Sequence, residues 1–437
     1  MLFSYTGRRV QESPIVRLLR RPLGWPTLEV YGMTGPLDGI RVIDLSTMLS
    51  GPWAADILGD QGADVIKVEV PGAGDHTRSL RNRQGGLSSM FLNINRSKRS
   101  VTINLKSEEG RSVLRDLVRD GDVLLQNFRP GVVDRLGVGY EAMHAINPRL
   151  VYVSISGFGE KGPYAHKRVY DPIVQALSSL TTIQAGSDTQ RPRLIRTILP
   201  DKLTAVTAAQ ATVSALLCRE RTGQGQHVRL SMLDAVISFL WASDMGGQTF
   251  YGREVSAQEA ASFIDLIYET KDGYMTVSVM TDKEWRGLCK AVGRPEWLDD
   301  ERFATPAGRD QHVNERLEMT QAALRERTTE EWLQLFDAHD VPAAPALTRS
   351  ALIEHPQVLA SDVLRLNPHP VAGTLRQPRT AARFEGTPPA APRGAPRLGE
   401  HTDEVLQELG YPAERIDALR GAGAIGAETA DAPRAAE

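Results

Sequence analysis

Short apolar runs alternate with helix-forming stretches along the first third of the chain. Residues 40–45 (IRVIDL) form one apolar run, a helix is predicted from Ser50 to about Gln61, and residues 64–68 (DVIKV) form the next run. A strand, a helix and a second strand in this spacing predict a βαβ unit, whose two strands must pair in parallel. The alternation continues to residue 155, so the sequence predicts an open α/β sheet with helices on both faces.

The remaining elements are predicted from apolar runs and helical periodicity. Further strands are expected at 100–105, 123–125, 150–155, 194–199, 228–231 and 274–279. Further helices are expected at 107–119, 140–146, 202–219, 233–250, 282–292, 310–327 and 329–338.

Changes in pattern and composition along the sequence predict how the chain is divided into domains. The change in pattern near residue 226 indicates a smaller second domain at 226–340, and the proline-rich stretch from 341 indicates loops and short strands that return over the first domain. Residues 1–35 are interpreted as a flexible extension, with a mitochondrial presequence or a start site placed too early as alternatives. The Ala/Gly-rich residues 421–437 predict a disordered tail.

Charge and cysteine content narrow the possible partners. The net charge of −3 gives no overall attraction to nucleic acid or to an anionic membrane, and neither partner is expected. No apolar run approaches the roughly 18 residues that a membrane helix needs. Two distant cysteines, Cys218 and Cys289, indicate neither a disulfide framework nor a zinc site. A reducing, cytoplasmic setting fits this composition.

Several motifs of other enzyme classes are missing or incomplete. Residues 157–162 (GFGEKG) match a dinucleotide-binding pattern, but Pro163 follows at once and no amphipathic helix begins there, so a tight loop is the better interpretation. The nine histidines form no metal-ligand spacing, and the chain has no GxSxG nucleophile motif.

Pattern alone leaves two candidate groups of residues open. Basic residues fall near predicted strand ends, where they would be either solvated charges or ligands for a phosphate: Lys98, Arg99, Lys106, Arg129 and Arg135. Asp201 precedes a long predicted helix, which is the position of an ordinary N-cap. The positive end of that helix would also keep the carboxylate ionised.

Six motifs in order resemble the family III CoA transferases, a group that includes α-methylacyl-CoA racemase. They are LDGIRVIDLSTMLSGPWAADILGDQGADVIKVE (37–69), NRSKRSVTINLK (95–106), LLQNFRPGVVDRLGVGYEAM (124–143), NPRLVYVSISGFGEKGPY (147–164), RTGQGQHVRLSMLDAV (221–236) and LGEHTDEVLQELG (398–410). The resemblance covers residues 36–410. It implies a large Rossmann-like domain built from both chain ends, 36–225 and 341–420, a small domain between them, and two chains interlocked as a homodimer.

The resemblance also implies the site residues. Asp201 takes the position of the nucleophile that forms covalent aspartyl intermediates, and Asp171 that of an acidic residue beside the site. The residues at the family's CoA contacts are Met48, Ser50, Ile103, Lys106, Asn127, Phe128, Arg135, Arg168 and Met232. No permanent cofactor or metal is implied, because coenzyme A and acyl-CoA are substrates.

Departures from the family narrow the expected reaction. Tyr170 stands where racemases carry histidine, which disfavours racemization. Leu49 stands where formyl-CoA transferases carry glutamine, and residues 257–270 lack their glycine run, which disfavours formate and oxalate. Arg196 is the candidate for holding the far carboxylate of a diacid such as succinate, although a surface charge is the alternative. An isomerase on the same fold and a non-catalytic CoA-binding protein are the rival functions.

Overall fold

Six parallel strands form the central sheet of this computed structural model, which describes residues 34–257 and 266–426. The strand order is β5-β2-β1-β6-β7-β8. The bounds are Arg41–Asp44 (β1), Asp64–Glu69 (β2), Lys98–Thr102 (β5), Val123–Gln126 (β6), Val151–Ser156 (β7) and His227–Ser231 (β8). All five pairings are parallel, which confirms the predicted α/β sheet.

The direction of the strand order reverses between β1 and β6. The chain adds β2 and β5 on one side of β1 and then returns to place β6, β7 and β8 on the other. In open α/β sheets, the loops that leave the carboxyl ends of strands at such a reversal diverge and form a ligand crevice. The fold therefore places a crevice where the chain leaves β1 and β6.

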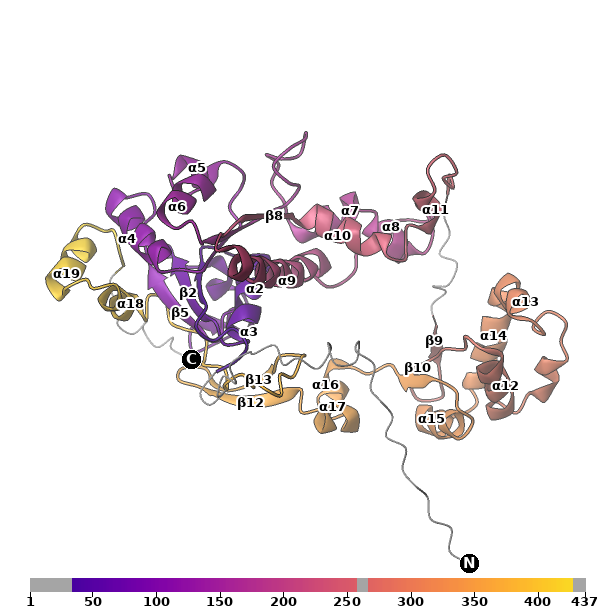
Figure 1. Cartoon of the computed structure of the whole chain (residues 1–437). Coiled ribbons are helices and arrows are strands. Elements are labelled where there is room, and N and C mark those ends of the chain that lie inside the picture. The colour runs from indigo at the N-terminus through magenta and orange to yellow at the C-terminus, as the bar shows by residue number, and fades with distance from the viewer. Residues whose placement is uncertain (1–33, 258–265, 427–437) are drawn as a thin grey trace, which may run out of the picture.

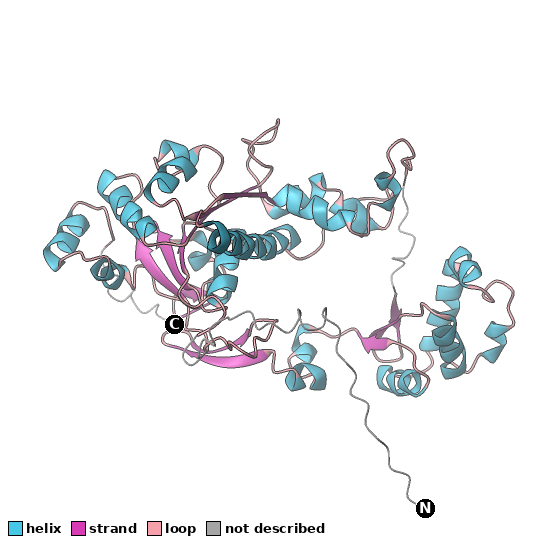
Figure 2. Cartoon of the chain, in the orientation of Figure 1, coloured by secondary structure: helices cyan, strands magenta, loops and turns pink. Residues whose placement is uncertain are grey.

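Helices cover both faces of this sheet (Figures 1 and 2). One face packs Leu114 and Leu117 against Ile43, and the other packs Leu58 and Ala208 around Val65. The helices between β1 and the small lobe are Ser50–Gly59 (α2), Ser89–Ile94 (α3), Glu108–Arg119 (α4), Val132–Arg135 (α5), Tyr140–Ile146 (α6), Asp171–Leu177 (α7), Leu180–Ala185 (α8), Leu199–Thr222 (α9), Met232–Trp241 (α10) and Gly246–Thr249 (α11). A 3-10 turn, His76–Ser79, and two-residue strands Arg83–Gln84 (β3) and Leu87–Ser88 (β4) complete this region.

The C-terminal helices belong to the same core as the first strands. Leu406 in α18 (Thr402–Glu408) and Ile416 in α19 (Ala413–Gly421) share a buried cluster with Ile43. The tail was predicted to be disordered from residue 421, but Ala424 and Ile425 are buried, so that boundary is wrong. Ile425 bridges to Ile103 at the end of β5, and only residues 427–437 of the predicted tail lie outside the described chain.

Residues 266–345 form a separate small lobe (Figure 1). The predicted start of the small domain at residue 226 is wrong, because β8 pairs with β7 in the central sheet. Its antiparallel sheet has the order β11-β10-β9, with bounds Ile267–Glu269 (β9), Tyr274–Val277 (β10) and Ala343–Pro345 (β11). Its helices are Asp282–Ala291 (α12), Pro306–Gln311 (α13), Val313–Leu324 (α14) and Thr329–Ala338 (α15), with a 3-10 turn at Pro295–Leu298. Trp285, Phe303, Trp332 and Phe336 fill a core of its own.

The chain returns from the small lobe through two short helices and a hairpin. These are Arg349–Leu352 (α16), Pro356–Ala360 (α17), Leu364–His369 (β12) and Gly373–Pro378 (β13). Gln377 connects the hairpin to the sheet lobe, because its amide donates to the carbonyl of Leu92, 285 positions earlier in the sequence (2.8 Å). Among the described residues, no helix is long and apolar enough to cross a membrane.

Two predicted elements differ from the structure. The predicted strand 194–199 is wrong, because residues 191–198 form an irregular segment and Leu199 and Pro200 already begin α9. Proline suits the first turn of a helix, where its missing N–H has no partner to lose. The predicted helix 233–250 ends at Trp241, and the short α11 follows it.

Candidate active site

A cavity of about 310 Å³ opens at the carboxyl ends of β1, β6 and β7. Its walls come from the loops after these strands and from the first turns of α7, α9 and α10. Most of the predicted site residues line it: Met48, Ser50, Asn127, Phe128, Arg168, Tyr170, Asp171, Asp201 and Met232. The fold thus brings together residues that lie more than 180 positions apart in the sequence.

The other predicted residues lie elsewhere. Arg135 lines a neighbouring cavity of about 430 Å³, which shares Phe128 as part of its wall. Lys106 is exposed beyond β5, whereas Ile103 is only 1% exposed and belongs to the core. Leu49 is buried directly before α2.

Arg196 does not line the cavity that contains Asp201. It is exposed in the irregular segment before α9, as are Arg191 and Arg193. The cationic side chains among the lining residues are instead Arg129, Lys167 and Arg168.

Asp201 is the third residue of α9, so its predicted position as the N-cap is wrong; Ile198 holds that position. The first turn of the helix still surrounds the carboxylate with the positive end of the helix dipole. Burial and the charge of Asp171 raise the pKa of Asp201 from its ordinary 3.8 to about 6, against hydrogen bonds from Ser50 that lower it. The group is therefore mainly ionised at neutral pH, but it takes up a proton far more readily than an exposed aspartate.

Asp171 supports the start of α9 from the neighbouring helix. It is the first residue of α7, is 3% exposed, and its Oδ2 accepts a hydrogen bond from the backbone N–H of Asp201 (3.2 Å). Burial raises the pKa of the Asp171 carboxyl, and hydrogen bonds from Gln175 and from that N–H lower it. The two carboxylates are thus joined through the backbone of one of them.

The loop that carries Met48 and Ser50 is held in an unusual conformation. Met48 has a φ of 70°, which is uncommon for a residue with a side chain and persists only where neighbours fix it. Asn127 bonds both the N–H and the carbonyl of Thr47 (2.9 and 2.7 Å). Lys67 donates to the carbonyl of Ser46 (3.0 Å), and the Met48 N–H faces Asp75.

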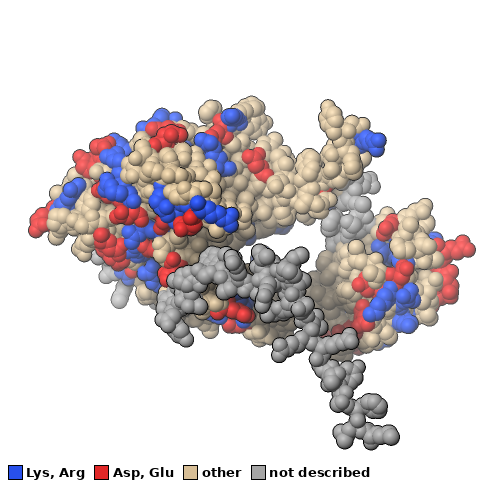
Figure 3. Space-filling model, in the orientation of Figure 1, with Lys and Arg blue, Asp and Glu red and all other residues tan. Residues whose placement is uncertain are grey.

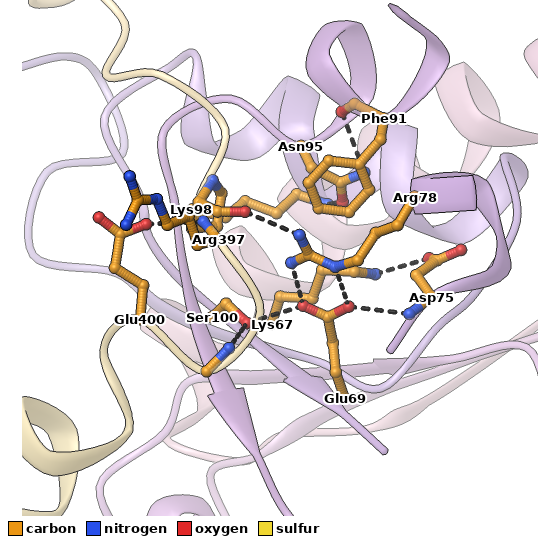
Figure 4. Close-up of polar contacts among 12 residues, drawn as sticks. Lys67, Glu69, Asp75, Arg78, Phe91, Asn95, Lys98, Ser100, Arg397 and Glu400 are labelled. Atoms are coloured by element: carbon orange, nitrogen blue, oxygen red, sulfur yellow. Dashed lines mark hydrogen bonds and ion pairs between the residues drawn. The ribbon is translucent and has the colours of Figure 1, made fainter. Parts of the chain in front are cut away.

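Lys67 and Asp75 belong to a buried group of charges behind this loop (Figure 4). Their side chains lie 2.9 Å apart, and both have no exposed surface. Burial alone would lower the pKa of Lys67, but Asp44 and Asp75 outweigh it and raise that pKa. Glu69 pairs with Arg78 in the same group. Buried opposite charges of this kind fix the loop rigidly, because removing one partner leaves the other without compensation.

Two of the basic residues considered as phosphate ligands are used for structure. Lys98 is buried and donates to Asp44 (2.9 Å) and to a carbonyl of α2, while Arg99 bonds Asp64 and two glutamates of α18. For Lys98 and Arg99, both the ligand interpretation and the solvated-charge interpretation are wrong. Charged residues inside a strand flanked by apolar ones, such as Lys67 in VIKVE, are the sequence signal that could have revealed this group.

The structure adds one residue that sequence reasoning missed. Gln175 lies one turn after Asp171 in α7 and donates to its carboxylate (2.6 Å). A glutamine in an amphipathic helix gives no pattern that distinguishes it from a surface residue.

The fold and the cavity together define an α/β protein with two coupled carboxylates, Asp171 and Asp201, beside a cavity at the carboxyl ends of its strands. In the part of the chain that the structure describes, no three His, Cys, Asp or Glu side chains form a metal-binding group.

Comparison with known proteins identifies the family. Residues 37–402 match the model of CoA-transferase family III. A succinate–glutarate CoA-transferase of Agrobacterium fabrum is 36% identical over 386 residues, covering 86% of this chain and 96% of the relative. A formyl-CoA:oxalate CoA-transferase of Shigella sonnei is 32% identical over 416 residues, covering 89% and 99%.

A solved structure agrees with these relatives. The crystal structure of a CAIB/BAIF family protein from Brucella suis has a TM-score of 0.75 and 30% identity, covering 86% of this chain and all of that one. The chain belongs to CoA-transferase family III, which confirms the resemblance drawn from its six motifs. It is a CoA-transferase, and enzymes of this family act on CoA thioesters.

Proposed function

We propose that this protein moves coenzyme A from an acyl-CoA thioester to a free carboxylic acid, with Asp201 as the nucleophile. The observation that carries the proposal is the position of Asp201. It lies in the first turn of α9, faces the cavity lined by most of the residues at the family's CoA contacts, and has a pKa of about 6. A carboxylate with this pKa is ionised at neutral pH and able to attack.

The proposed reaction proceeds through exchange of thioesters and anhydrides. A carboxylate oxygen of Asp201 attacks the thioester carbonyl, the C–S bond breaks, and CoA leaves as the thiolate. The thiolate then attacks the aspartyl carbonyl of the mixed anhydride, which releases the donor acid and forms an aspartyl-CoA thioester. The acceptor carboxylate then attacks the aspartyl-CoA carbonyl, which releases the CoA thiolate and forms a second mixed anhydride. The thiolate attacks the acceptor carbonyl of this anhydride, so that the CoA thioester of the acceptor forms and the Asp201 carboxylate is regenerated. One thioester replaces another, and the balance needs no nucleotide or oxidant.

The CoA contacts are proposed for the residues that line the two adjoining cavities. Asn127, Phe128 and Arg168 line the cavity with Asp201, and Arg135 lies in the next one. Lys106, exposed beyond β5, lines neither cavity, and its contact with CoA is proposed from the family's motif alone. We leave Ile103 out of these contacts, because its side chain is in the core.

The most useful test of the nucleophile is Asp201→Asn. The variant should fold and bind acyl-CoA but lose nearly all transfer, because an amide cannot form the anhydride. Hydroxylamine added during turnover should trap the thioester, and mass spectrometry should locate the adduct on Asp201. More than a few per cent of wild-type activity in the variant, or an adduct elsewhere, would reject the assignment.

The same assay separates the rival functions. A transferase needs the acceptor acid, an isomerase turns over without it, and a non-catalytic binding protein shows no turnover at all. Tyr170, 67% exposed at the cavity in place of the racemase histidine, supports transfer over racemization.

We propose a dicarboxylate as one acid substrate. The names of the two relatives described above include the diacids succinate, glutarate and oxalate, beside formyl-CoA in the second. Arg129, Lys167 and Arg168 line the cavity and replace Arg196 as candidates for the far carboxylate. Leu49, in place of the glutamine of formyl-CoA transferases, favours succinate or a C5 diacid over oxalate. Equal kcat/KM for succinate and butyrate would reject the diacid proposal but leave the transferase assignment intact.

We further propose the interlocked homodimer and the two-domain division of each chain. Large apolar side chains are exposed on two neighbouring helices: Val206, Val213 and Leu217 on α9, and Phe239 and Trp241 on α10. Large apolar side chains exposed together on neighbouring helices are typical of interfaces. Figure 3 shows an opening between the small lobe and the rest, through which a second chain could pass. Light scattering that gave a stable monomer would reject this arrangement. A cytoplasmic location stays a prediction.

A further inference from the structure

Gln175 is a buried amide that the proposed reaction does not use. Its residue is 2% exposed. Its Nε2 donates to Asp171 Oδ1 (2.6 Å) and to the carbonyls of Thr197 (3.2 Å) and Ile195 (3.4 Å), and its Oε1 accepts from the N–H of Ile195 (2.9 Å). One amide group thus connects α7 to the segment that enters α9.

The Gln175 amide bonds the backbone of Ile195 in the way that a neighbouring strand would. Both the N–H and the carbonyl of Ile195 bond to the Gln175 amide, as they would bond to the backbone of a strand in a sheet. This residue lies in the irregular segment 191–198, six positions before Asp201. The amide therefore fixes where the first turn of α9 begins.

The contact to Asp171 reaches the same turn from the other side. Asp171 Oδ1 accepts from Gln175 while its Oδ2 accepts from the N–H of Asp201. Gln175 thus holds the position of Asp201 by two routes, through the backbone before it and through the carboxylate that bonds its N–H.

We infer that Gln175 is a positioning residue for the Asp201 carboxylate, an inference that rests on the proposed role of Asp201. Other charged groups surround this junction: Arg129, Lys167 and Arg168 line the same cavity, and α2, which packs against α9, carries the buried Asp56. Of the neighbouring charges, that of Asp171 raises the pKa of Asp201. Lys202 is exposed and its Nζ bonds Thr197 (2.8 Å), α8 carries no charged residue, and the one charged residue of α10, Asp234, is exposed. The electrostatic coupling between Asp171 and Asp201 is therefore the property that Gln175 should control.

The test is Gln175→Met, which keeps the length of the side chain and removes its hydrogen bonds. Displacing the first turn of α9 should lower kcat by about tenfold to a hundredfold while the donor KM changes little. Loss of the donated bond also raises the pKa of Asp171, so Asp171 stays neutral over a wider range and repels Asp201 less. The acid limb of kcat/KM should therefore move to lower pH.

Gln377→Met is the matched control. Gln377 is 3% exposed and its amide also connects two elements, the β12–β13 hairpin and α3, away from the cavity. The Gln377→Met variant should lose about as much stability as Gln175→Met, but its kcat and its pH profile should match those of the wild type. If Gln175→Met behaves like this control, with the hydroxylamine adduct still on Asp201, the role of Gln175 is rejected and the nucleophile stands. An adduct on another residue would overturn both.

A second variant covers the case in which Gln175→Met does not fold. Gln175→Glu keeps the shape and the acceptor for Ile195, but its second oxygen must share a proton with Asp171. When that shared proton is lost, two adjacent anions repel, so activity should fall again at alkaline pH. A pH profile without this new basic limb would contradict the inference.

Discussion

Replacing the proposed nucleophile should make the protein more stable while it abolishes transfer. The pKa of Asp201 is raised from 3.8 to about 6 by folding. When the carboxylate is ionised in both the folded and the unfolded protein, this shift lowers the free energy of unfolding by about 3 kcal/mol. Because Asp201 is partly exposed, solvent screening reduces this to about 1–2 kcal/mol. Asparagine has the same shape without the charge, so Asp201→Asn should raise the free energy of unfolding by this amount.

The pH dependence distinguishes this effect from a general change in packing. An acid with a raised folded pKa carries no penalty below pH 3.8, a growing penalty up to about pH 6, and the full penalty above it. For a chain of 437 residues, 1 kcal/mol corresponds to about 1 °C in Tm. Calorimetry should therefore find the variant about 1–2 °C more stable at pH 8 and about a third as much more stable at pH 4.5, where only part of the penalty is present.

Asp310→Asn, at an exposed position of α13, serves as the control for loss of one charge. The same difference in Tm between Asp201→Asn and wild type at both pH values would refute the electrostatic reasoning. So would a variant that is less stable than wild type at pH 8.

Three further predictions concern neighbouring residues. Asp171→Asn removes the charge that helps raise the pKa of Asp201, so the acid limb of kcat/KM, expected near pH 6 in the wild type, should move down; an unmoved limb would contradict the coupling. Arg135→Ala and Arg168→Ala should each weaken donor binding by about 1–3 kcal/mol, seen as a raised KM, and an unchanged KM in both would reject the CoA contacts. Lys67→Met leaves Asp75 buried without its cation and should lower the free energy of unfolding by about 3–5 kcal/mol in urea titrations, whereas equal stability would show that the buried pair is dispensable.

The sheet could be predicted because its signals are local. Each strand around Val42, Val65 or Val153 is a short apolar run, and a helix follows each run along the chain. The segment 194–199 shows the limit of this reasoning. Its apolar residues resemble a strand, yet the partner of Ile195 is a glutamine side chain rather than another strand. A pairing of that kind depends on the placement of α7, which no local pattern contains.

The site was predictable as far as it follows from strand ends. Asn127 and Phe128 directly follow β6, and Met48 and Ser50 follow β1, so the topology alone brings them together. Ile103 also follows a strand, but it is covered by Ile425 from the far end of the chain. That contact spans more than 300 positions, and only the folded structure reveals it.

The surroundings of Asp201 act in opposite directions on stability and on reactivity. The start of α9 and the hydrogen bonds from Ser50 favour its ionised form, whereas burial and the charge of Asp171 oppose it. The balance leaves about nine tenths of the groups ionised at pH 7, with a more basic and hence more nucleophilic carboxylate than an exposed aspartate offers. Asp171 at once fixes the backbone of Asp201 and repels its side chain. Replacing Asp171 with asparagine should therefore shift stability and rate in opposite directions, because the same repulsion lowers the stability and raises the basicity of Asp201.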